Sequence, residues 1–138
     1  MIKTKVVFLK KNSKMQQEEE EKVVGILAYL TIIGFIIAII MNKDKQGDEK
    51  MNNAFHLRQA LGLHIATIIL FIGYSIISAI FLVFGSLFIF ISQLLYLIIT
   101  IVILVFMITG VVNAINGKQT NLPFIGDYIA KVFRNTFE

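Results

Sequence analysis

Apolar residues gather in two long blocks that only short polar segments interrupt. The first block covers residues 23–41, and the second is a run of 59 residues, Gln59 to Gly117, without one Asp, Glu, Lys or Arg. Surface helices of soluble domains carry polar residues on their outward face. A charge-free run of this length therefore predicts an integral membrane protein.

The lengths of the two blocks predict how many helices cross the membrane. The 19 residues of the first block would extend about 28 Å as a helix, close to a hydrocarbon core of roughly 30 Å. The second block would extend about 88 Å as a single helix, so it must turn back. Gly85 and Ser86 are the best turn residues, which predicts spans at about 60–84 and 87–112.

A short amphipathic helix is expected after the last span. Pro123 is the only proline, and it stops any helix that continues from the membrane. Beyond it, over residues 124–137, apolar side chains recur at helical spacing, while Asp127, Lys131 and Arg134 occupy the other face. This pattern is typical of a helix that lies in the membrane interface.

The predicted fold is thus an all-α membrane bundle over residues 23–133, with three transmembrane helices, preceded by a polar and partly disordered tail at residues 1–22. Four spans are the alternative, but the second turn would fall near Ser92, where no Gly or Pro supports it. With three spans, the loop at residues 42–58 and the C-terminus share one side with seven cations, and the N-terminal tail lies opposite with six. The positive-inside rule barely separates these numbers, and we expect the loop and C-terminus inside.

Composition and charge narrow the function classes. Charged residues make up 16% of the chain, below the roughly 25% of soluble domains. The net charge of +4 comes from groups at the chain ends and in one loop, which suits lipid headgroups better than a nucleic acid. No cysteine is present, and the spans contain no Asp, Glu, Lys or Arg, no phosphate-binding loop and no Ser/His/Asp arrangement. We expect neither an enzyme nor a cofactor.

The densest polar chemistry near the membrane lies at the boundaries of the charge-free run. His56, Gln59 and His64 follow one helical stripe, and the predicted topology brings Asn113 and Asn116 to the same membrane face. This cluster could form a polar mouth of the bundle. The favoured interpretation is that these side chains tie helix ends together. Two histidines eight residues apart lack a third ligand, so no metal site is expected.

Three segments, read in order, resemble a known family: residues 28–45, 55–63 and 113–127. They are similar to a prokaryotic family of small, uncharacterised membrane proteins with an H-x-x-Q-A-L signature, which is distantly similar to the Tic-type import component of the chloroplast inner envelope. The signature residues here are His56, Gln59, Ala60 and Leu61. The resemblance implies a helical bundle of three or four spans in a bacterial inner membrane. Its distant plastid branch implies a translocation-related role.

Two functional hypotheses follow. The first is a structural or interaction subunit that binds another membrane protein, or a second copy of itself, through the small-residue faces of the second predicted span. The alternative is a channel or protein-translocation component with its polar mouth at residues 56–64 and 113–116. No nucleic acid is expected as a partner.

Overall fold

The computed structural model describes residues 1–137, and every regular element among them is helical. The expectation of an all-α protein is confirmed. In chain order the elements are α1 (Ile2–Leu30), α2 (Ile32–Lys43), α3 (Gly47–Phe81), the 3-10 helix η1 (Leu82–Phe84), α4 (Ser86–Ile115) and α5 (Gly126–Val132).

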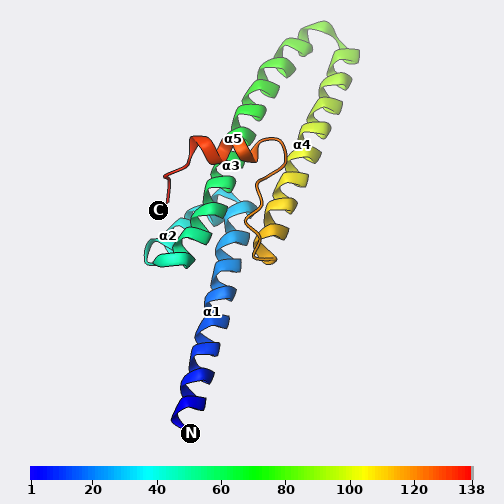
Figure 1. Ribbon diagram of the computed structural model, residues 1–138. Helices are drawn as coiled ribbons and strands as arrows, with labels where there is room; N and C mark the ends of the chain where they lie inside the picture. Colours follow the sequence, from blue (N-terminus) through cyan, green and yellow to red (C-terminus); the bar gives the residue numbers. More distant parts are fainter. Residues whose placement is uncertain (138) are drawn as a thin grey trace.

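Helices α3 and α4 form a long antiparallel hairpin that projects from one end of the molecule (Figure 1). The chain turns at Gly85, at the position that the sequence indicated. The φ of Gly85 is 97°, a conformation that a side chain would resist. Both arms are long and apolar enough to cross a membrane, and most of their large apolar side chains are exposed.

The first predicted span is not a single helix. Thr31 has an extended backbone (φ −152°, ψ 161°), which ends α1 and begins α2. The Thr31 hydroxyl accepts a hydrogen bond from the Gly34 N–H at 2.9 Å, so this residue acts as the N-cap of α2. Gly34 lets α2 fold back closely on α1, because a Cβ there would lie 2.5 Å from the Leu27 carbonyl oxygen.

This fold-back bears on which helices are long enough to cross a membrane. The apolar part of α1 and the whole of α2 would extend about 12 and 18 Å, each well short of a hydrocarbon core of roughly 30 Å. Within residues 1–137, two helices rather than three are long and apolar enough to cross a membrane.

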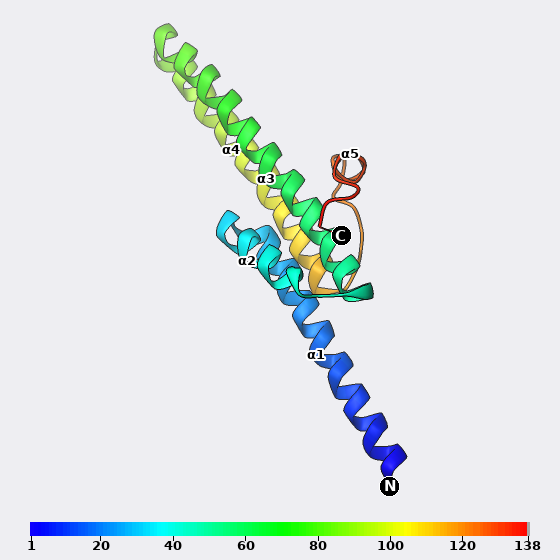
Figure 2. The ribbon, with the colours of Figure 1, turned by 90° about the vertical axis from the view of Figure 1, so that its left-hand side faces the viewer.

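The N-terminal segment is also more regular than expected. Residues 2–22, predicted as a partly disordered tail, form the first turns of α1. Lys, Gln, Glu and Met are good helix formers and are frequent here. This part of α1 extends away from the α3–α4 hairpin, so the N-terminus and the hairpin turn lie at opposite ends of the molecule (Figures 1 and 2).

The end of the α3–α4 hairpin opposite Gly85 carries Asp48, Glu49, Lys50 and Arg58 and forms its charged end. The core lies where α1 and α2 meet this charged end, seen from the side in Figure 2. Small residues bring the helices together, since a Cβ on Gly25 would lie 2.5 Å from the Ala114 Cβ. The buried apolar side chains of this core are Val24, Ala28, Tyr29, Phe35, Ala38, Leu57, Ala60, Leu63 and Leu122.

Helix α5 is shorter than the predicted interfacial helix over residues 124–137. Phe124 has a positive φ of 62°, and the regular helix ends at Val132. The chain then leaves the helix so that the Phe137 ring packs edge-on against Phe35, with the ring centroids 6.0 Å apart. The residues after α5 thus pack against α2 instead of continuing the helix.

Candidate functional site

Gln59 fastens the C-terminal segment to α3. Its side chain is 1% exposed. Its Nε2 donates to Asn121 Oδ1 at 2.9 Å and to the Gly126 carbonyl at 3.0 Å, and its Oε1 accepts from the Leu122 N–H at 3.2 Å. Every polar atom of this buried amide is thus bonded to the segment that leads into α5. Arg58, the preceding residue, donates to the Arg134 carbonyl and holds the same segment farther along.

His64 serves a different helix end. Its Nε2 lies 2.9 Å from the carbonyl oxygen of Ala28, in the last turn of α1. A carbonyl only accepts, so Nε2 carries the proton in this bond. Because Thr31 interrupts the helix, the backbone carbonyls of this last turn lack the N–H donors that a continuing helix would supply. The histidine therefore satisfies a backbone group that would be costly to leave unpaired in an apolar environment.

We expect His64→Ala to destabilise the α1–α2 turn. The substitution leaves the Ala28 carbonyl without its donor, at a cost of about 1–3 kcal/mol. The measurement is the free energy of unfolding in mixed micelles, titrated with SDS. His64→Gln retains an N–H donor and should recover part of the loss. Equal destabilisation by both variants would show that the bond to Ala28 contributes little.

His56 lies beside an open polar cleft on the charged end of the bundle. Its ring packs edge-on against Tyr29 and Phe55, with centroid distances of 6.1 and 5.3 Å. The buried His56 Nδ1 and Asn53 Nδ2 have no hydrogen-bond partner among the described protein atoms. The cleft has a volume of about 310 Å³. Its lining residues are Glu18, Glu21, Lys22, Asn52, Asn53, His56, Ala114, Asn116, Gly117 and Gln119.

The two asparagines at the end of α4 bond locally. Asn113 Nδ2 donates to the Thr120 carbonyl at 3.3 Å, and Asn116 Nδ2 donates to the Val112 carbonyl at 2.8 Å. Asn113 thereby supports the turn that follows α4. Asn116 also lines the cleft beside His56.

The five predicted residues therefore form separate contacts. His56 and Asn116 share the cleft, whereas Gln59, His64 and Asn113 each bond to a different backbone or side-chain group. Among residues 1–137, no group of three or more His, Cys, Asp or Glu side chains could hold a metal ion.

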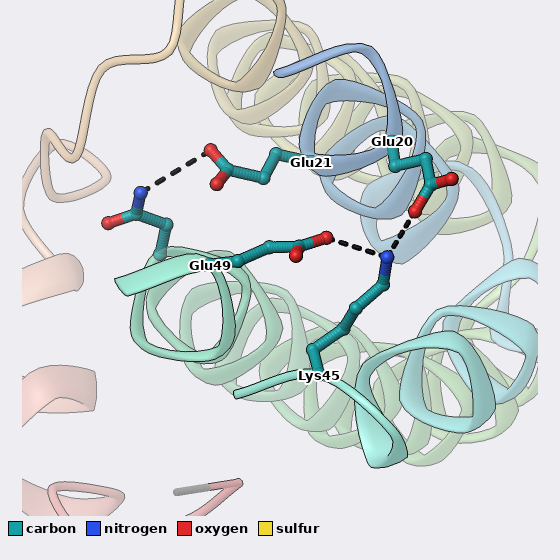
Figure 3. A network of polar contacts seen from close by, with 5 residues as sticks. Glu20, Glu21, Lys45 and Glu49 are labelled. Carbon is teal, nitrogen blue, oxygen red and sulfur yellow. Dashed lines mark hydrogen bonds and ion pairs between the residues drawn. The ribbon is translucent and has the colours of Figure 1, made fainter. Parts of the chain in front are cut away.

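A network of charged residues joins α1 to the start of α3, and sequence reasoning missed it (Figure 3). Lys45, in the α2–α3 loop, forms ion pairs with Glu20 of α1 and with Glu49 of α3, the second at 2.7 Å. Hydrogen bonds to Glu20 and Glu49 raise the pKa of Lys45. Asn52 Nδ2 donates to Glu21 at 3.3 Å, and burial raises the pKa of the Glu21 carboxyl.

The four glutamates Glu18 to Glu21 lie within the segment that the sequence predicted as a polar tail. The i,i+4 spacing of Lys45 and Glu49 is the one local signal that could have indicated part of this network. Gln119 extends it by donating to Asn52 Oδ1, which brings the turn after α4 to the same place.

Comparison with known proteins identifies the family. No curated protein and no solved structure is significantly similar to the chain. A model of the MamF/MmsF family, described as the magnetosome magnetite crystal formation protein family, matches residues 20–129. The match begins at Glu20, which pairs with Lys45, and ends at Ile129, which packs against Gly62. It thus includes most of the contacts described above and more than half of the chain. The chain belongs to the magnetosome magnetite crystal formation protein family, a family of small membrane proteins.

Proposed function

We propose that this chain is a non-enzymatic structural subunit of an assembly in a bacterial inner membrane, where it binds another membrane protein or a second copy of itself. The observation that carries the proposal is that the polar side chains near the core hold chain segments together. Gln59, His64 and Thr31 each bond to a helix end or to a connecting segment. These bonds fix several chain segments relative to one another, and together the segments form a surface next to the apolar hairpin.

Family membership supports the same role. The family description associates its members with magnetite crystal formation in magnetosomes. The structural role proposed for this chain rests on the bonds described above.

A photo-crosslinking amino acid at Met51 tests the proposal in cells at native expression. Met51 is 63% exposed and lies beside Asn52 at the charged end. We expect it to capture a defined membrane protein or a second copy, identified by mass spectrometry. The matched control is Phe84, which is 61% exposed at the hairpin turn and should capture no protein. Capture of no protein from Met51, or of the same products from both positions, would contradict the proposal.

A channel or translocation component is the second candidate, and the polar cleft beside His56 favours it. The distant resemblance to the chloroplast import component implies this role, although the comparisons give that resemblance no support. The two candidates differ in how they respond to His56→Ala. The measurement is flux across the membrane of proteoliposomes that contain the protein. If His56→Ala abolishes this flux while the variant accumulates normally in cells, the channel is favoured over the structural subunit.

A further inference from the structure

We propose that the chain crosses the membrane twice, through α3 and α4, and that α1 and α2 approach and leave the membrane from one side without crossing it. Both termini and the α2–α3 loop then share the cytoplasmic side. All Lys and Arg residues then lie on that one side of the membrane.

The polar network supplies the first argument. Glu20 and Glu21 directly precede the first apolar block, and Lys45 and Asn52 follow it. A single span between them would separate these groups by roughly 30 Å of hydrocarbon. Instead, Lys45 is ion-paired with Glu20, and Asn52 is hydrogen-bonded to Glu21 (Figure 3). The two ends of the block therefore lie on the same side.

The turn between α1 and α2 supplies the second argument. Leu30, Thr31 and Ile32 lie near Leu63 and His64, at the charged end of the apolar part of α3. Twenty residues of α3 and η1 continue beyond His64 to Phe84, a distance of about 30 Å. The α1–α2 turn thus stops a full membrane thickness short of the hairpin turn at Gly85.

The exposed apolar faces of the two short helices fit a position at the membrane surface. In α2, Ile33, Ile36, Ile37 and Ile40 follow the i, i+3, i+4, i+7 pattern and are 44–73% exposed. The α5 segment exposes Phe124, Tyr128 and Val132, four residues apart. The hairpin between α2 and α5 faces lipid. The exposed apolar faces of α2 and α5 therefore suit contact with acyl chains at the edge of one leaflet.

The charge distribution then gives the orientation. All 13 Lys and Arg residues lie in residues 3–58 or 118–134. In the two-span arrangement they all fall on one side, and the Gly85 turn has none. The positive-inside rule, which barely distinguished seven cations from six, now compares 13 with zero. It places the charged end in the cytoplasm, against the anionic leaflet.

The chain has no cysteine, so single substitutions provide labelling sites without background. We choose four exposed positions: Lys14→Cys in α1, Gln46→Cys in the α2–α3 loop, Gln119→Cys after α4, and Ser86→Cys at the hairpin turn. A membrane-impermeant maleimide is applied to right-side-out and inside-out vesicles. We expect the first three to react at least tenfold faster in inside-out vesicles, and Ser86→Cys to show the opposite preference.

Each other pattern overturns the proposal. Labelling of Lys14→Cys from the same side as Ser86→Cys would restore three spans. Labelling of the three charged-end positions from outside would reverse the orientation. Accumulation equal to the wild-type chain is the control for folding. The structural role proposed above does not depend on this topology, since the Met51 crosslink can succeed with either arrangement.

Discussion

Gln59→Leu is expected to release the C-terminal segment from the bundle. The substitution keeps a side chain of similar size but leaves the Leu122 N–H and the Gly126 carbonyl without their partner. Buried unpaired groups cost about 1–3 kcal/mol each, so the docked state should lose roughly 3 kcal/mol. Tryptic cleavage after Lys131, which requires α5 to open, should accelerate by about 100-fold in detergent micelles.

Gln93→Leu is the matched control for this variant. Gln93 is exposed on α4, where a leucine suits lipid at least as well, so cleavage after Lys131 should stay at the wild-type rate. If Gln59→Leu and Gln93→Leu are cleaved equally slowly, the bonds from Gln59 do not hold α5 in place.

Gly110→Ala is expected to separate α1 from α4. A Cβ at this position would lie 2.4–2.6 Å from three carbon atoms of the Tyr29 ring, which is 2% exposed. Overpacking of this kind costs about 1–3 kcal/mol. SDS titration of the protein in mixed micelles should show this loss in the free energy of unfolding.

Gly73→Ala provides the comparison on the other long helix. A Cβ there meets nothing within 4 Å, so the substitution should be neutral or should stabilise α3 through helix propensity, by up to about 1 kcal/mol. The double variant Gly110→Ala/Tyr29→Leu should recover part of the loss, because the ring that clashes is gone. Equal stability of Gly110→Ala and Gly73→Ala would rule out a tight α1–α4 contact.

The features that the sequence predicted are those that local pattern determines. The charge-free run gives the two arms of the hairpin, and Gly85 gives the turn, because hydrophobic length and backbone freedom act within a few residues. The break at Thr31 could not be found in this way. A threonine within an apolar block is ordinary, and the turn depends on Gly34 fitting against Leu27 and on His64 reaching Ala28.

In the candidate site, too, spacing along one helix could be predicted, whereas contacts between residues far apart in the sequence could not. Helical spacing placed His56 and His64 on one stripe, but eight residues separate them by about 12 Å along the axis, enough for different partners. His56 therefore faces the cleft, whereas His64 bonds to the end of α1. The partners of Gln59 lie more than sixty residues downstream, where periodicity carries no information about pairing.

The uninterrupted course of α1 has a mechanical consequence. Residues 2–19 lie beyond the ion pair of Glu20 with Lys45, and as a helix they form an arm of about 27 Å. The same helix continues inward to Tyr29, which is wedged against Gly110 of α4. The free arm and the buried contact with α4 are thus parts of one continuous helix, which Lys45 holds at Glu20 between them.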